Sequence, residues 1–317
     1  MRVPAALATL LAIGVLVSAA AARQDSDPRE SQDPTFRAGT RTVPVFVTVT
    51  DRIGRLVLDL RREEFQVLDD GRPRPLSLFT RDLQPITAVV LLDASRSMVN
   101  ALDTVLTAAD HLVVRLMAGD RAMVGSFSDE IRFASDFTDD RDLLARQVND
   151  LFGLRIGLGT SLWDAIDQAV QALTPHEGRR MVVVFTDGDD TASLTPSVDV
   201  LARARGNDVM IYSVIMRGMA RPPENRRGRR IRPQQLANIS LATGGGYYFV
   251  GNVLDDMNSI ATQIAMELHS QYVLGFVPPE LDGKLHKLEV RVTRPGVKVR
   301  ARDSYLAVPQ PARASQQ

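Results

Sequence analysis

The middle of the chain alternates short apolar runs with longer amphipathic stretches, from about residue 86 to residue 268. Short unbroken apolar runs are typical of strands buried on both faces of a parallel sheet. The expected strands are 86–92, 122–127, 131–136, 181–186, 208–216 and 246–250. The expected helices are 98–117, 140–152, 162–173, 196–205, 234–242 and 253–268. This alternation predicts a mainly parallel sheet with helices on both faces, in which 131–136 is an antiparallel edge strand.

Both ends of the chain have strand patterns of another kind, in which apolar and polar residues alternate. The valines of 43–49 share one face of an expected strand, and Asp70-Gly71 is a strong hairpin signal. The same alternation returns in 272–277, 285–293 and 297–302. The segment 41–82 has too few strands to stand alone, so we expect it to pack with the C-terminal strands. The predicted fold class is α/β: a doubly wound, Rossmann-like sheet with a small β-sandwich formed by the N- and C-terminal flanks.

A polar motif ends the apolar run at Ala88 to Leu92. The motif is Asp93-Ala94-Ser95-Arg96-Ser97, and a helix is expected to follow it. A tight turn can direct the side chains of Asp93, Ser95 and Ser97 to one point at the carboxyl end of the strand, where open α/β sheets bind ligands. All three offer oxygen, which suits a hard divalent cation such as Mg²⁺. A helix cap formed by Ser or Asp is the alternative.

Two further segments bring candidate ligands to the same edge of the sheet. The glycine-rich turn 157–161 leaves the hydroxyl of Thr160 at the start of a helix. The apolar run Met181 to Phe185 ends in Thr186-Asp187-Gly188-Asp189-Asp190, which adds the carboxylate of Asp187. As neighbours after a strand, Asp189 and Asp190 are expected to cap the following turn and not to form an acid–base pair. The alternatives to a binding site are the cap at residues 93–97, a cap at Thr160 and a simple turn at Asp187-Gly188. Three such coincidences at one edge favour a binding site.

Together these segments resemble the metal-ion-dependent adhesion site of the von Willebrand factor type A (VWA) domain. The matching stretches are DASRS at 93–97, GLGTSLWDAI at 157–166 and TDGDDTAS at 186–193. The resemblance covers about residues 84–269, and the flanks resemble a family of exported bacterial VWFA-related proteins. It implies that Ser95, Ser97 and Thr160 are direct ligands of Mg²⁺ or Mn²⁺. It also implies that Asp93 and Asp187 bind through water or hold the ligands in place.

A cation held mostly by neutral hydroxyls keeps much of its charge and can accept an outside carboxylate. The residues and the resemblance therefore predict a non-enzymatic adhesion module that captures a protein partner presenting a carboxylate. One alternative is a structural component of a cell-envelope complex whose β-sandwich makes metal-independent contacts. The other is a metal-assisted hydrolase, which ranks lowest because no positioned general base accompanies the hydroxyls.

The composition adds a compartment and excludes several classes of protein. The 38 basic and 38 acidic residues give a net charge of +0, so no overall charge favours nucleic acid. The absence of cysteine excludes disulfides, thiol nucleophiles and a lipid anchor after the leader. Arg2, a short apolar core and small residues up to Ala22 predict a secretory signal, and no other segment is apolar enough to span a membrane. We therefore expect a periplasmic or extracellular protein; the sequence does not indicate its oligomeric state.

The expected domain organisation follows from these patterns. It comprises a signal peptide 1–22, a disordered linker 23–40, a β module 41–82, a VWA domain 84–269, C-terminal strands 270–308 and a disordered tail 309–317.

The segment 217–233 is unusually basic, with seven arginines and one glutamate. It follows the strand 208–216 and so leaves the sheet at the edge where the candidate ligands lie. One hypothesis is a basic rim that steers acidic partners toward the metal, formed by Arg226, Arg227, Arg229 and Arg230. A solvated flexible insertion and a site of proteolytic cleavage are the alternatives.

Overall fold

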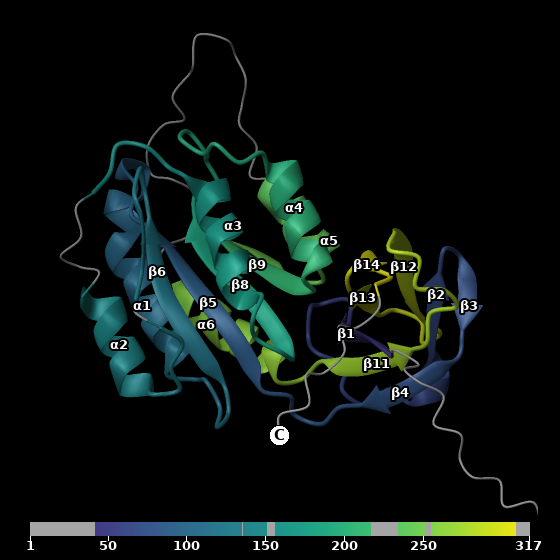
Figure 1. The fold of residues 1–317 in the computed structure, drawn as a ribbon. Helices are drawn as coiled ribbons and strands as arrows, with labels where there is room; N and C mark the ends of the chain where they lie inside the picture. Colours follow the sequence, from purple (N-terminus) through teal and green to yellow (C-terminus); the bar gives the residue numbers. More distant parts are fainter. Residues whose placement is uncertain (1–41, 135, 151–155, 217–233, 251–254, 309–317) are drawn as a thin grey trace, which may run out of the picture. The chain divides into compact units, whose positions relative to one another are not determined.

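The computed structural model describes residues 42–134, 136–150, 156–216, 234–250 and 255–308 (Figure 1). The expected signal peptide, linker, arginine-rich segment and C-terminal tail lie outside these residues. None of the helices in the described ranges combines the length and the hydropathy needed to cross a membrane.

A six-stranded sheet forms the centre of the α/β region, in the order β10-β9-β8-β5-β6-β7 (Figure 1). Its strands are β5 (Ile86–Asp93), β6 (Arg121–Phe127), β7 (Ile131–Phe133), β8 (Arg179–Thr186), β9 (Val209–Met216) and β10 (Tyr247–Val250). All neighbouring strands run parallel except β7, which pairs antiparallel with β6 at the edge. The predicted doubly wound sheet with one antiparallel edge strand is confirmed.

Helices cover both faces of this sheet because successive residues of each strand point to opposite sides. The helices are α1 (Leu102–Val113), α2 (Arg141–Asp150), α3 (Leu162–Leu173), α4 (Ser197–Gly206), α5 (Gln234–Ala242) and α6 (Asp255–Leu268). In β5, Val90 and Leu92 belong to the core with α1 and α6, whereas Val89 and Leu91 belong to the core with α3 and α4. Burial on both faces explains why this strand is apolar at every position from 88 to 92.

The helix predicted for 98–117 is shorter than expected. Residues Arg96–Ala101 form a 3₁₀-helix, in which Met98 N–H donates to the carbonyl of Ser95 at 3.0 Å, and α1 ends at Val113. The chain then turns through Gly119, whose φ of +91° lies in the left-handed region. The edge strand β7 is also shorter than the predicted 131–136. The boundaries are set by these turns, which apolar periodicity does not report.

The two flanks of the chain combine into two four-stranded sheets, β13-β1-β11-β4 and β14-β12-β2-β3. The N-terminal strands are β1 (Val43–Thr50), β2 (Phe65–Asp69), β3 (Arg72–Arg74) and β4 (Leu76–Thr80). The C-terminal strands are β11 (Tyr272–Phe276), β12 (Leu285–Val292), β13 (Lys298–Arg300) and β14 (Ser304–Leu306). Strand β1 pairs with β11 and β13, and β2 pairs with β12. Buried residues of both sheets form one apolar core, as the prediction of a shared β-sandwich requires.

Polar contacts join the end of α6 to the first of these sheets. The buried carboxylate of Glu267 accepts hydrogen bonds from Tyr212 of β9 at 2.8 Å and from Thr48 of β1 at 3.2 Å, and it pairs with Arg300 of β13. Because these partners come from both regions of the chain, the network fastens the sandwich to the α/β core.

Candidate metal centre

Asp93 is the last residue of β5, and its fully buried side chain connects two loops. Its Oδ2 accepts a hydrogen bond of 2.6 Å from the hydroxyl of Thr186, at the end of the neighbouring strand β8. Its Oδ1 accepts one of 2.9 Å from the N–H of Ser95, and the hydroxyls of Ser95 and Ser97 lie 3.1 Å apart. The three residues of the first motif therefore come together at the carboxyl end of the strand.

The glycine-rich turn lies directly against this first loop. The N–H of Gly157 donates to the carbonyl of Ala94 at 3.3 Å, and the N–H of Arg96 donates to the carbonyl of Gly157 at 3.0 Å. A Cβ atom on Gly157 would lie 1.8 Å from Oδ1 of Asp129 and 2.4 Å from the hydroxyl of Ser128. Only glycine fits here, because any side chain would push the turn after β6 away.

Thr160 joins the glycine-rich turn to the loop that follows β8. Its carbonyl accepts hydrogen bonds from the N–H groups of Thr191 and Ala192 at 2.9 and 3.0 Å, and its own N–H donates to the hydroxyl of Thr191 at 2.9 Å. Thr160 itself is buried. All three loops that carry candidate ligands are thus connected to one another by hydrogen bonds.

The amino terminus of α3 is capped by the loop after β8 and not by Thr160. The carboxylate of Asp190 accepts from the N–H of Leu162 at 3.0 Å, and the hydroxyl of Ser193 accepts from the N–H groups of Trp163 and Asp164 at 2.9 and 3.2 Å. The sequence predicts that Asp190 caps the turn following it. Its carboxylate does accept a hydrogen bond from the hydroxyl of Ser193 in that turn, but the backbone N–H that it caps belongs to a helix 28 residues earlier.

Capping also fails to explain the other hydroxyls. Ser95 and Ser161 stand at the N-cap positions of the first 3₁₀-helix after β5 and of α3, and neither makes a side-chain capping hydrogen bond. The hydroxyl pair of Ser95 and Ser97 and the hydroxyl of Thr160 therefore remain candidates for ligands.

The turn that the sequence indicates at Asp187-Gly188 is present in the structure. Gly188 has a φ of +85°, and Oδ1 of Asp187 accepts a hydrogen bond of 3.1 Å from the N–H of Asp189. This local contact uses one lone pair of the carboxylate, so it does not prevent Asp187 from acting on a nearby cation.

Three aspartates, Asp93, Asp187 and Asp189, determine the electrostatics of the site, and the basic residue of its first loop, Arg96, is exposed. Burial raises the pKa of Asp93 to about 7, and the negative charge of Asp187 adds to this, against the hydrogen bonds from Ser95 and Thr186. Burial and Asp187 also raise the pKa of Asp189. In the described part of the chain, none of these three aspartates forms a salt bridge. Carboxylates and hydroxyls without a cationic partner are the donor set that fits a hard divalent cation.

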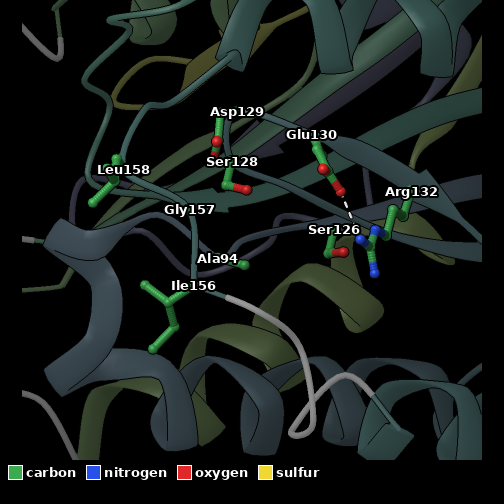
Figure 2. Close-up of a pocket in the computed structure, with 9 residues that line it drawn as sticks. All are labelled: Ala94, Ser126, Ser128, Asp129, Glu130, Arg132, Ile156, Gly157 and Leu158. Atoms are coloured by element: carbon green, nitrogen blue, oxygen red, sulfur yellow. Dashed lines mark hydrogen bonds and ion pairs between the residues drawn. The ribbon is translucent and has the colours of Figure 1, made fainter.

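A cavity of about 400 Å³ adjoins the first two loops (Figure 2). Ala94 and Gly157 form one wall of it, and the cavity is also lined by Ser126, Ser128, Asp129, Glu130, Arg132, Ile156 and Leu158. Glu130 and Arg132 form an ion pair of 2.6 Å at its rim. The sequence motifs do not include the lining residues Ser126, Ser128, Asp129, Glu130 and Arg132, because these lie on the β6–β7 hairpin and match no motif.

The fold and the arrangement of the three loops define the class of protein as a VWA domain. The sequence model of the von Willebrand factor type A domain matches residues 88–263, which is more than half of the 317 residues. The chain belongs to the VWA family. No curated protein sequence is significantly similar to it.

Several solved structures are similar to this chain. One is an aerotolerance-related membrane protein from Bacteroides fragilis, with 21% identity over 58% of this chain and 98% of that chain, and a TM-score of 0.46. Another is proximal thread matrix protein 1 from the mussel byssus with a zinc-occupied MIDAS motif, with 16% identity over 62% of this chain and 48% of that chain, and a TM-score of 0.49. The vWF domain of the type V pili tip protein Mfa5 from Porphyromonas gingivalis has 13% identity over 59% of this chain and 97% of that chain, and a TM-score of 0.44.

Proposed function

We propose that this chain is an exported module that binds a protein partner through a divalent cation, Mg²⁺ or Mn²⁺. Ser95, Ser97 and Thr160 would supply hydroxyl ligands. Asp93 and Asp187 would bind through water or hold those hydroxyls in position. The observation that carries the proposal is the buried carboxylate of Asp93, which is bonded to two of three interconnected loops and has no cationic partner within the described ranges of the chain.

The different roles proposed for the hydroxyls and the carboxylates support capture of an acidic group of a partner. A bound cation would supply a positively charged coordination position for a carboxylate of the partner. The hydroxyls would not neutralise that charge, and Asp93 is kept away from the partner by its burial. The hydrogen bond from Thr186 fixes the orientation of the Asp93 carboxylate. In metal sites, residues that hydrogen-bond to the ligands commonly orient them in this way.

We propose binding and not catalysis for this site. A hydrolase would need a general base within hydrogen-bond reach of the reacting water. The four histidines all lie in the described residues and outside the three loops. His111 lies in α1, His176 follows the far end of α3, His269 is bonded to Asp120, and His286 lies in β12.

Affinity capture tests the proposal. The mature protein would be immobilised and exposed to envelope and culture-medium proteins in Mg²⁺, beside Thr160→Val and the control Thr107→Val, which removes an exposed hydroxyl of α1. We expect the wild type and the control to retain a partner. EDTA or soluble poly-aspartate should release this partner, and poly-asparagine should not. Retention that is equal for all three proteins and indifferent to EDTA would contradict the proposal.

A further inference from the structure

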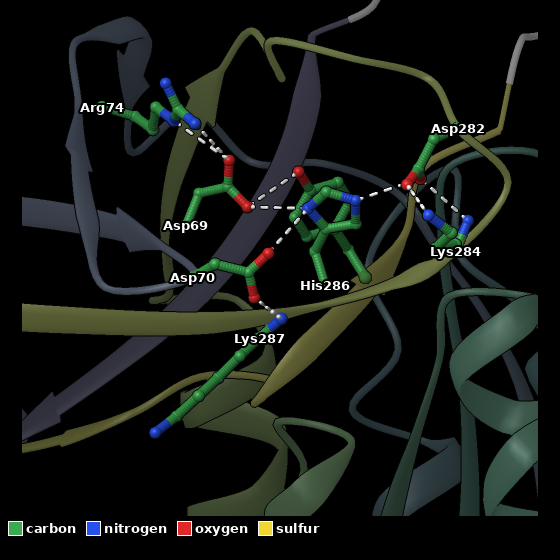
Figure 3. Close-up of polar contacts among 8 residues, drawn as sticks. Asp69, Asp70, Arg74, Asp282, Lys284, His286 and Lys287 are labelled. Atoms are coloured by element: carbon green, nitrogen blue, oxygen red, sulfur yellow. Dashed lines mark hydrogen bonds and ion pairs between the residues drawn. The ribbon is translucent and has the colours of Figure 1, made fainter.

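A histidine in the second sheet of the sandwich faces carboxylates with both ring nitrogens (Figure 3). Nδ1 of His286 lies 3.2 Å from Oδ1 of Asp69 and 3.1 Å from Oδ2 of Asp70. Nε2 lies 3.1 Å from Oδ1 of Asp282. Ionised carboxylates accept hydrogen bonds and cannot donate them, so both ring nitrogens must carry a proton for all these contacts to be favourable.

The ring of His286 lies among three carboxylates, of which only two pair with another basic side chain of the described residues. The charged and titratable groups around it are Asp69 and Asp70 of β2 and its turn, Arg74 of β3, Tyr305 of β14, Asp282 and Lys284 of the loop after β11, and Lys287 of β12 itself. Arg74 pairs with Asp69 at 2.9 Å, and Lys284 pairs with Asp282 at 3.2 Å. Asp70 accepts the backbone N–H of Lys287 at 2.9 Å. In the described part of the chain, Asp70 has no such basic side-chain partner, so a protonated His286 ring supplies the positive charge beside it.

The three carboxylates come from segments that only the fold brings together. Asp69 and Asp70 belong to the β2–β3 hairpin, whereas Asp282 belongs to the loop 277–284 between β11 and β12. His286 therefore bridges this loop to the hairpin. The ring also contacts the ring of Tyr305, with centroids 5.3 Å apart, which fixes its orientation from the other side.

We propose that His286 is a proton-dependent clasp, which fastens the loop 277–284 onto the sheet while its ring is doubly protonated and loosens that loop when the ring becomes neutral. A neutral imidazole keeps one N–H and one lone pair. The side chain of Asp69 is 1% exposed and has no access to water, so the remaining proton stays on Nδ1. The lone pair of Nε2 then faces Oδ1 of Asp282, which is 24% exposed and can turn to solvent.

The direction of the pH effect follows from the same contacts. Burial on its own would lower the pKa of His286, but Asp282, Asp69 and Asp70 outweigh it and raise the pKa above the ordinary value. Stabilisation by a group whose pKa is raised on folding is complete below the pKa of the unfolded chain, about 6.5, and is lost as the pH rises through the folded value. The clasp is therefore closed in weak acid and open in weak base.

The same atoms could in principle hold a metal ion, since the ligand atoms of Asp69, Asp70 and His286 all lie within 4.8 Å of one another. The oxygens of Asp69 are already engaged, Oδ2 by Arg74 and Oδ1 by the hydroxyl of Tyr305 at 3.1 Å. The guanidinium beside the carboxylate favours a proton over a divalent cation at this position. Titration with Zn²⁺ distinguishes a protonated ring from a metal-bound one.

Nuclear magnetic resonance of the ¹⁵N-histidine-labelled mature protein tests the clasp, with His286→Gln used to assign the ring signals. At about pH 6 we expect both ring nitrogens to be protonated, with a titration midpoint above the ordinary value of about 6.5. The Nδ1–H tautomer is expected after deprotonation. Asp282→Asn removes the partly exposed carboxylate without disturbing the contact between His286 and the buried Asp69. The titration midpoint of His286 in this variant is therefore expected below that of the wild type.

Amide hydrogen exchange measures how firmly the loop 277–284 is held on the sheet. The N–H of Gly283 donates to the carbonyl of Ala307 at 2.8 Å, and the N–H of Asp70 donates to the carbonyl of Lys287 at 2.9 Å. We expect the protection of Gly283 to fall about tenfold across the His286 titration, the effect of losing one charge-assisted hydrogen bond, while Asp70 remains protected. In Asp282→Asn this pH step should vanish. A midpoint at or below the ordinary value, an unchanged Gly283, or displacement of the Nδ1 proton by added Zn²⁺ would overturn the proposal.

Discussion

The hydroxyl of Thr186 donates a hydrogen bond of 2.6 Å to the carboxylate of Asp93, between the ends of two adjacent parallel strands. Both side chains are fully buried. The bond fixes the loop after β5 and the loop after β8 in one register, and it holds Asp93 in place although no basic side chain of the described residues pairs with it. The geometry of the candidate metal centre therefore depends on a residue that is not itself a predicted ligand.

Thr186→Val tests this dependence, because valine keeps the shape of threonine and removes the donor. A buried acceptor without its partner costs about 1–3 kcal/mol, so the free energy of unfolding should fall by that amount. Metal affinity should fall about 10- to 100-fold, as for other residues that position ligands. Chemical denaturation and calorimetry measure the two effects. Thr107→Val, on the exposed side of α1, should change neither quantity, and an equal effect in both variants would refute the assigned role.

Gly157→Ala should destabilise the protein and loosen the site. Its new methyl group would collide with Asp129 and Ser128, at distances that require the turn after β6 to move. Such overpacking costs about 1–3 kcal/mol. Gly206→Ala in α4 is the matched control, since a Cβ there meets no atom within 4 Å. A thermal melt of Gly157→Ala no lower than that of the control would show that the close contact is not rigid.

The aspartates of the loop after β8 should separate into two roles. Asp187→Asn should abolish binding of Mg²⁺, because its charge acts on Asp93 and the cation. Asp190→Ala should keep binding but lower stability by about 1 kcal/mol, the usual cost of a lost helix cap. Calorimetry and denaturation of both variants distinguish the roles. Loss of binding in Asp190→Ala with unchanged stability would reverse the assignment.

Much of the fold could be predicted because it depends on periodicity along the chain. The run from Val89 to Leu92 is apolar at every position since alternate residues enter different cores, and the valines of β1 alternate since only one face of that strand enters the sandwich core. The proximity of Asp93, Ser95 and Ser97 could be predicted because they stand close together in sequence, directly after a buried strand.

The remaining features depend on contacts between distant residues, which no local pattern reports. Asp190 caps a helix that starts 28 residues before it, and Thr186 reaches an aspartate 93 residues away. His286 meets Asp69 across 217 residues. In each case the residue type allowed several partners, and the packing of the strands selected one.

Asp120 should govern part of the acid stability. Burial alone would raise the pKa of Asp120, but the hydrogen bonds from His269 and from the N–H groups of Met117 and Ile86 outweigh it and lower the pKa. A lowered pKa stabilises the fold above the unfolded value of about 3.9, and this contribution is lost as the pH falls through the folded value.

Asp120→Asn should therefore lower the free energy of unfolding by about 2 kcal/mol at neutral pH, because its amide cannot accept all three bonds. The variant should also lose less stability than the wild type between about pH 4 and pH 2. Urea unfolding at several pH values measures both effects. Parallel pH curves for the two proteins would mean that Asp120 does not carry the acid dependence.

Isothermal titration of the metal-free mature protein with Mg²⁺, and with Mn²⁺ in parallel, tests the central claim most directly. We expect one saturable site in the wild type, retained in Thr107→Val and lost in Asp93→Ala and Thr160→Ala. No saturable binding of either ion to a folded wild-type protein, or binding that survives both alanine substitutions, would contradict the claim that these three loops form a metal centre.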